Sequence, residues 1–199
     1  MKKNNKIFNI AFIGVFAAII AVVSFTPLRT LGLEITFSMV PIAVGAIVFG
    51  PTVGAVLGGV YGIVSFLQCF GFSPFGAALL SINPLLTALV CIPTRILAGW
   101  ISGLLFKALS RRDGWMSKAA YPVAALAAPL LNTVFFMSMM VLCFYNTEYI
   151  QGFVSQLGAN NPFTFILLFV GINGAVELAC GFAVAMPAAV AVKRVVSHL

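Results

Sequence analysis

Residues 81–95 read Ser-Ile-Asn-Pro-Leu-Leu-Thr-Ala-Leu-Val-Cys-Ile-Pro-Thr-Arg, a stretch that sets polar side chains within a run apolar enough to cross a bilayer. Its main polar side chains are Asn83, Thr87, Thr94 and Arg95. Pro84 and Pro93 each lack a backbone N–H, so we expect the helix to kink or open locally. An arginine near mid-membrane is costly and should face protein or a water-filled cavity.

Two roles are open for Arg95. It lies in or beside a ligand cavity, which the flanking polar residues and prolines favour, or it pairs with another buried group and locks two helices together. The surrounding sequence is consistent with both.

The composition around this stretch is that of an integral membrane protein. The chain has 199 residues, of which 62% are hydrophobic and 8% charged, whereas a soluble domain has about 25% charged residues. A spanning helix takes about 20 residues, so about six spans fit and little is left for a soluble domain.

Apolar runs divide the chain into six predicted transmembrane helices within one domain that covers residues 1–199. The predicted spans are 7–25, 35–49, 52–70, 78–105, 121–145 and 162–192. We interpret the first run as a retained helix, because it has no small-residue cleavage site and leads directly into further spans. Glycines at 54, 58 and 62 in the third span predict close packing against another helix. The fold class is therefore an all-α integral membrane protein.

The net charge of +7 follows the predicted topology. Nine of the 11 lysines and arginines fall in the two tails and in the loop between the fourth and fifth spans. Arg29 is the one basic residue predicted in an outer loop, and Arg95 lies within a span. The positive-inside rule then places both termini in the cytoplasm. The positive charge therefore reflects the predicted membrane topology and does not indicate a nucleic-acid partner.

Polar residues deep in the last three spans form the candidate substrate site. Arg95 and Glu177 are the two ionisable side chains predicted at mid-membrane, where they pair or share a polar ligand. The predicted substrate-binding residues are Asn83, Thr87, Arg95, Asn132, Asn173 and Glu177. We expect a cavity that opens outward under the loops at 28–34, 71–76 and 147–161. Arginine suits a carboxylate and asparagine suits amide and hydroxyl groups, although Arg29 is a competing carboxylate partner.

Motifs for catalysis and energy coupling are missing from the sequence. It contains no Gly-x-Ser-x-Gly motif, no histidine within a span and a single aspartate, Asp113. The four cysteines show no metal-ligand spacing and are interpreted as core-packing thiols. No Walker motif is present. We therefore expect no enzyme activity, no metal and no cofactor, and a subunit that takes its energy from partners.

Small residues recur at four-residue spacing on the first span, as Gly14 with Ala18 and Ala17 with Ala21. Such faces allow another helix to approach closely. Contact within the same protein and contact with a partner subunit are both open interpretations.

Several segments together resemble the substrate-binding S component of energy-coupling-factor (ECF) vitamin transporters. They are the Ala/Gly-rich first span, the run from Ile35 through Gly-Pro-Thr-Val-Gly-Ala-Val-Leu-Gly, Ser-Pro-Phe-Gly at 73–76, Ser-Ile-Asn-Pro at 81–84 and Pro-Thr-Arg-Ile-Leu-Ala-Gly at 93–99. The last three resemble the pantothenate branch, and riboflavin is the next candidate.

The resemblance implies an S-component-like bundle of six helices in a bacterial plasma membrane, with an outward-facing vitamin site. It also implies a transmembrane coupling subunit that docks on the first helix at Ala17 and Ala21, with Gly14 and Ala18 as a second register. Two cytoplasmic ATPase subunits would drive uptake. The alternatives are a stand-alone channel or facilitator for small solutes, and a structural subunit in which Arg95 and Glu177 form a buried staple.

Overall fold

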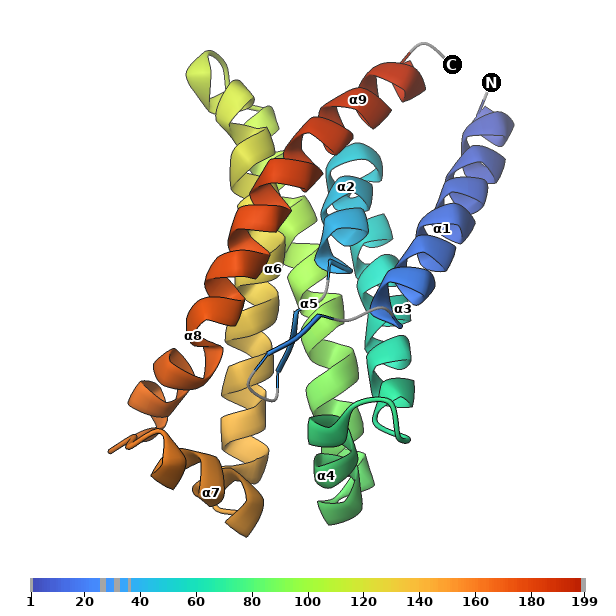
Figure 1. The fold of residues 1–199 in the computed structure, drawn as a ribbon. Coiled ribbons are helices and arrows are strands. Elements are labelled where there is room, and N and C mark those ends of the chain that lie inside the picture. Colours follow the sequence, from blue (N-terminus) through green and yellow to red (C-terminus); the bar gives the residue numbers. More distant parts are fainter. Residues whose placement is uncertain (1, 26–27, 31–32, 36, 198–199) are drawn as a thin grey trace.

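The structure is a computed structural model that describes residues 2–25, 28–30, 33–35 and 37–197. Side chains are described for residues 10–25, 37–171, 174–176, 178–179 and 181–196. The elements are α1 (Lys2–Ser24), β1 (Leu28–Thr30), β2 (Leu33–Ile35), α2 (Met39–Phe49), α3 (Pro51–Gln68), α4 (Pro74–Ile82), α5 (Pro84–Ser110), α6 (Trp115–Phe144), α7 (Glu148–Gln156), α8 (Pro162–Cys180), the π-helix η1 (Gly181–Ala185) and α9 (Met186–Ser197) (Figure 1).

Four helices among the described residues are long and apolar enough to cross a membrane, namely Pro51–Gln68, Pro84–Ser110, Trp115–Phe144 and Gly174–Val196. The remaining apolar helices are shorter and comprise Ile10–Ser24, Met39–Phe49 and Pro162–Gly171. With 11 residues, α2 is only about 16 Å long, roughly half the thickness of a bilayer's hydrocarbon core. A multi-pass membrane protein is supported, and the count of six spans stays a prediction.

The segment expected to be an outer loop at 28–34 is largely a two-stranded antiparallel hairpin. β1 pairs with β2 in the register Leu28 with Ile35, Arg29 with Glu34 and Thr30 with Leu33. Because Ile35 belongs to β2, the helix expected from residue 35 begins instead at Met39. The side chains of Arg29 and Glu34 lie outside the described residues.

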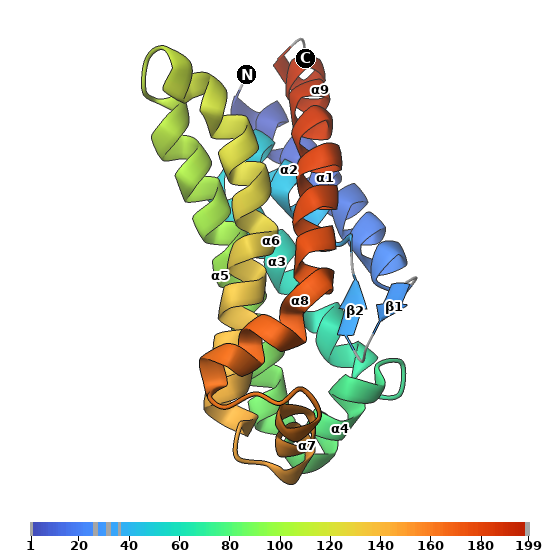
Figure 2. The ribbon, with the colours of Figure 1, turned by 60° about the vertical axis from the view of Figure 1, so that its left-hand side comes forward.

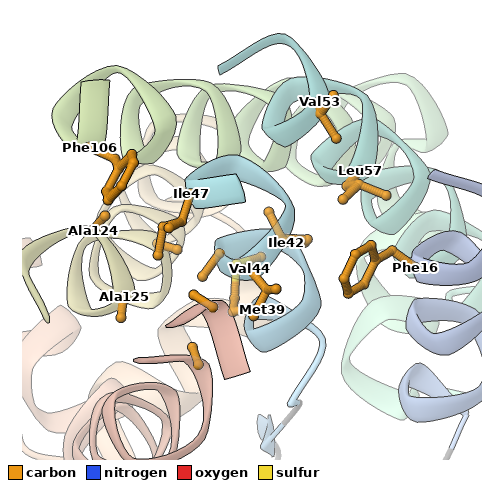
Figure 3. Packing of buried hydrophobic residues seen from close by; sticks show 14 of the residues in the cluster. Phe16, Met39, Ile42, Val44, Ile47, Val53, Leu57, Phe106, Ala124 and Ala125 are labelled. Atoms are coloured by element: carbon orange, nitrogen blue, oxygen red, sulfur yellow. The ribbon is translucent and has the colours of Figure 1, made fainter. Parts of the chain in front are cut away.

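Helix α2 lies at the centre of one half of the bundle, and its side chains are buried almost all round. The packed residues are here called the α2 cluster and include Phe16, Met39, Ile42, Val44, Ile47, Val53, Leu57, Phe106, Ala124 and Ala125 (Figure 3). They come from α1, α2, α3, α5 and α6, with Ala185 and Ala189 added from η1 and α9. A helix that is apolar on every face is stable only when neighbouring elements surround it.

Helices α3 and α5 pack backbone to backbone, which confirms the prediction from the glycine spacing. A Cβ placed on Gly58 would overlap the carbonyl oxygen of Arg95, and one on Gly54 would overlap that of Gly99. At Gly62 the added atom would lie 2.8 Å from the Cα of Ile92. Only a residue without a side chain fits these positions, so the seam fixes α3 against α5 at the level of Arg95.

The predicted fourth span, 78–105, consists of two helices. α4 ends at Ile82, Asn83 adopts an extended backbone, and α5 starts at Pro84. The expected break at Pro84 is therefore confirmed, because proline suits the first helical position and Asn83 caps the helix through its side chain. Pro93 lies inside α5, and the helix continues through it.

The N-terminal end of α1, the C-terminal end of α9 and the α5–α6 loop lie at one end of the bundle (Figures 1 and 2). The two nine-residue helices α4 and α7 lie at the opposite end. The chain between α7 and α9 changes direction at Gly171, whose φ of 36° favours glycine, and passes through η1. The described ends of α1 and α9 therefore lie at the same end of the bundle, and the cytoplasmic placement of the termini stays a prediction.

Candidate functional site

Arg95 is 5% exposed and lies where α5 meets α3 and α6. One turn of α5 supplies part of its environment. Nη1 donates hydrogen bonds to the carbonyl oxygen of Val90 at 2.9 Å and to Oγ1 of Thr94 at 3.1 Å. The Thr94 hydroxyl in turn donates to the same Val90 carbonyl at 2.6 Å. One nitrogen of the guanidinium is thus fixed by its own helix.

Helix α3 supplies a second, weaker partner. Nη2 of Arg95 lies 3.5 Å from Oγ of Ser65, at the limit of a hydrogen bond. The Ser65 hydroxyl lies 4.0 Å from Sγ of Cys91, toward which it donates. Cys69, one turn beyond Ser65, donates its thiol hydrogen to the Ser65 carbonyl at 3.4 Å.

Two aromatic rings lie close to the guanidinium. Cζ of Arg95 is 4.2 Å from the ring centroid of Phe136 on α6 and 5.6 Å from that of Tyr61 on α3. Cation–π contacts of this kind are worth more when the cation is desolvated, at about 2 kcal/mol. The rings stabilise the charge without using any N–H of the guanidinium.

Two buried polar side-chain atoms have no hydrogen-bond partner among the described residues. They are Nε of Arg95 and Oδ1 of Asn132. Asn132 is 8% exposed and lies on α6, one turn before Phe136. Buried polar groups are almost always satisfied in native proteins, so these two atoms point to a partner other than the described side chains.

Asn83 and Thr87 lie nearer the start of α5 and use their polar atoms locally. Oδ1 of Asn83 accepts from the backbone N–H groups of Leu85 and Leu86, each at 3.1 Å. The hydroxyl of Thr87, which is 1% exposed, donates to the Asn83 carbonyl at 2.9 Å. These bonds give both residues a structural role at the helix start, and their contact with a substrate stays a prediction.

Asn173 and Glu177 lie on α8, and their side chains are outside the described residues. The predicted pairing of Arg95 with Glu177 is therefore untested. Among the described side chains the carboxylates are Asp113 and Glu148, which lie in the α5–α6 loop and at the start of α7, at opposite ends of the bundle.

Sequence reasoning missed Tyr61, Ser65 and Phe136. Tyr61 and Ser65 are four residues apart on the glycine-rich face of α3, a spacing that places both on the side facing α5. Phe136 stands four residues after Asn132. Each pair is spaced by four residues and so lies on one face of its helix. This spacing identifies the residues as part of the site only when α3 and α6 are known to flank Arg95.

The end of the bundle formed by α4 and α7 contains a dense group of rings. The aromatic cluster consists of Phe75, Tyr149, Phe153, Phe165 and Phe169, with centroid separations of 5.0 to 6.1 Å between contacting pairs. Met137, Met140 and Phe144 of α6 pack in the same core. Burial raises the pKa of the Tyr149 phenol. Two of the three loops expected to cover the site, 71–76 and 147–161, thus contribute rings to a packed aromatic layer.

The two small-residue pairs on α1 differ in their surroundings. Gly14 and Ala18 are exposed, and a Cβ added to Gly14 would meet no atom within 4 Å. Ala17 and Ala21 are half-buried, next to the buried Phe16 and Ile20. The first pair therefore lies on the open face of α1, and the second lies partly toward the bundle.

A comparison with protein families finds a match to the ECF transporter, substrate-specific component family over residues 8–189. The chain belongs to this family. A search of curated proteins finds no match. The family is a transporter component that binds substrate and works with an ECF module, and it is not an enzyme family. No group of three or more potential metal-ligating side chains occurs in the part of the chain whose side chains the structure describes.

Proposed function

We propose that this substrate-specific component captures a small water-soluble vitamin, pantothenate, outside a bacterial cell for ATP-driven uptake. The segments around Ser73–Gly76, Ser81–Pro84 and Pro93–Gly99 resemble the pantothenate branch of the family. Arg95 is the observation that carries the proposal, because it is a buried cation whose Nε has no partner among the described side chains, and pantothenate carries a carboxylate. Asn83, Thr87, Asn132, Asn173 and Glu177 complete the proposed site.

The proposed topology has six spans with both termini in the cytoplasm. The shared end of α1 and α9 and the basic residues of the α5–α6 loop support it. The α4–α7 end, which carries the aromatic cluster, then faces outward.

The proposed partners are a transmembrane coupling subunit and two cytoplasmic ATPases. Of the two candidate docking registers on α1, Gly14 and Ala18 lie on the exposed face, whereas Ala17 and Ala21 are half-buried. We therefore assign docking to the Gly14–Ala18 register, since a partner helix reaches it without displacing the bundle.

Calorimetric titration of the purified protein in detergent tests the substrate. We expect one-to-one binding of pantothenate, much weaker binding of riboflavin, and no ATPase activity from the isolated chain. Tight binding of riboflavin instead would replace pantothenate as the substrate. Transport of solute into liposomes without ATP or partner subunits would contradict the proposal and favour a channel.

A further inference from the structure

The hairpin formed by α5 and α6 ends in a strongly basic segment, here called the α5–α6 tip. The tip comprises residues 104–118, which are the last turns of α5, the loop 111–114 and the first turn of α6. Its four cations are all exposed and comprise Lys107, Arg111, Arg112 and Lys118. Asp113 is the one acidic residue in this segment of the sequence, so positive charge is in clear excess at the tip.

The charged groups of the tip are not used within the fold. Among the described residues, none of the four basic side chains makes a hydrogen bond, an ion pair or a ring contact, and the neighbouring Asp113 forms no ion pair with them. Lys193 on α9 differs, because its Nζ lies over the rings of Phe106 and Tyr121. The cations of the tip are therefore available to an anion outside the chain.

The position of the tip and its apolar side chains indicate what kind of anion it meets. The α5–α6 loop stands apart from the described ends of α1 and α9 at the same end of the bundle (Figures 1 and 2). Leu104 and Leu105 on α5 are 37% and 36% exposed, and Trp115 at the start of α6 is 77% exposed. Exposed leucines suit the hydrocarbon of a bilayer, whereas an indole suits its interface and basic side chains reach the headgroups. The tip thus combines the side chains that match one leaflet from hydrocarbon to headgroup.

We propose that the α5–α6 tip is a docking surface for anionic phospholipids, whose headgroups its four cations bind while Trp115 lies in the same leaflet. A zwitterionic lipid carries an ammonium group that offsets its phosphate, whereas phosphatidylglycerol leaves the phosphate charge unmatched. Attraction to an anionic surface strengthens binding by roughly fivefold for each Lys or Arg near it. The positive-inside rule sets the side of the membrane on which the loop lies. The class of lipid beside the loop is a separate property, and it does not depend on which vitamin the protein binds.

Quenching of tryptophan fluorescence by brominated lipid measures which lipid lies beside the tip. The chain has two tryptophans, so Trp100→Phe leaves Trp115 as the only one. The full chain is placed in nanodiscs of phosphatidylcholine and phosphatidylglycerol in equal parts, with bromine on the acyl chains of one lipid or of the other. We expect brominated phosphatidylglycerol to quench Trp115 at least about twofold more strongly than brominated phosphatidylcholine. High salt should reduce the difference, because it screens the attraction.

Two variants of the tip, made in the same Trp100→Phe background, test whether its charge is the cause. Lys107→Gln/Arg111→Gln/Arg112→Gln removes three charges and should make the two lipids quench equally. Arg111→Lys/Arg112→Lys keeps the charge and should keep the preference for phosphatidylglycerol. Both variants should melt at the temperature of their parent in phosphatidylcholine alone, since the altered side chains are exposed and have no partner in the part of the chain that the structure describes.

The matched control removes the same number of charges from the N-terminal segment. Lys2→Gln/Lys3→Gln/Lys6→Gln alters that segment, whereas the tip is unchanged. The described N-terminal end of α1 lies apart from the α5–α6 loop (Figure 1). We expect this variant to retain the preference of Trp115 for phosphatidylglycerol, because the attraction falls off within about 8 Å at physiological salt.

Three results would overturn the lipid proposal. Equal quenching by the two lipids in the parent protein shows that the tip does not select anionic lipid, and its charge would then fit an acidic protein surface instead. A preference that survives the loss of three charges from the tip shows that other residues cause it. A preference lost to the same extent in the N-terminal control shows that it follows the net charge of the protein and not the tip.

Discussion

The two ends of the bundle are packed with different kinds of side chain. The α2 cluster is built mainly from alanine, valine and isoleucine. The opposite end contains the aromatic cluster with Met137 and Met140, and includes the nine-residue helices α4 and α7. Small side chains bring backbones together and fix their spacing, whereas methionines and aromatic rings adjust more readily to a changed neighbour. We therefore expect the end that contains the α2 cluster to be the rigid end and the end that contains the aromatic cluster to be the adaptable end, with Arg95 between them.

The largest expected effect concerns the glycine seam that continues the rigid end. Gly58→Leu places a side chain where the Arg95 carbonyl already lies, so α3 and α5 must separate. We expect loss of the folded protein, corresponding to destabilisation of about 4 kcal/mol or more. Size-exclusion profiles in detergent and melting temperature measure it.

The control for this variant lies at the adaptable end. Gly152 on α7 has no atom within 4 Å of an added Cβ, so Gly152→Ala should be neutral or stabilise by about 0.5–1 kcal/mol through helix propensity. A folded, stable Gly58→Leu protein would contradict the close α3–α5 seam.

The next largest expected effect is a difference in stability between a substitution in the α2 cluster and one in the core around the aromatic cluster. Ala128 is fully buried at the rigid end of α6, and Met137 is 2% exposed toward the adaptable end of the same helix. Ala128→Leu should destabilise by about 1–3 kcal/mol through overpacking, whereas Met137→Leu should cost less than about 1.5 kcal/mol. Melting curves of the two variants make the comparison, and equal losses would show that the two ends have the same rigidity.

The smallest expected effect concerns the attachment of α9 at the terminal end. Nζ of Lys193 lies 4.6 Å from the ring centroid of Phe106 and 5.2 Å from that of Tyr121. Lys193→Met removes these cation–π contacts and should cost about 0.5–1 kcal/mol, while Lys193→Arg should retain most of the stability. The exposed Lys118, changed to methionine, is the control. Equal melting temperatures for the Lys193→Met and Lys193→Arg proteins would show that the contact contributes nothing.

Features set by local chemistry were predictable from the sequence. The break at Asn83-Pro84 follows from proline geometry, and the close seam follows from the glycine spacing on α3. The polarity of Arg95 and Asn132 inside apolar spans was enough to select both.

Features that depend on which helices become neighbours were not predictable. The β1–β2 hairpin is only three residues per strand, too short for a clear alternation of polar and apolar residues. Ser65 and Phe136 carry no unusual local signal, since their importance comes from facing Arg95 across two helix interfaces.

The backbone contact between Gly58 and Arg95 has a mechanical consequence. The residue proposed to hold the vitamin is also a point where α3 and α5 touch with no side chain between them. A displacement of the Arg95 side chain is therefore expected to move α3 and α5 together, because their backbones are in direct contact at this point. We expect ligand binding at Arg95 to shift α3 and α5 as one unit. Smaller local rearrangements are expected only in the aromatic cluster and in the short helices α4 and α7.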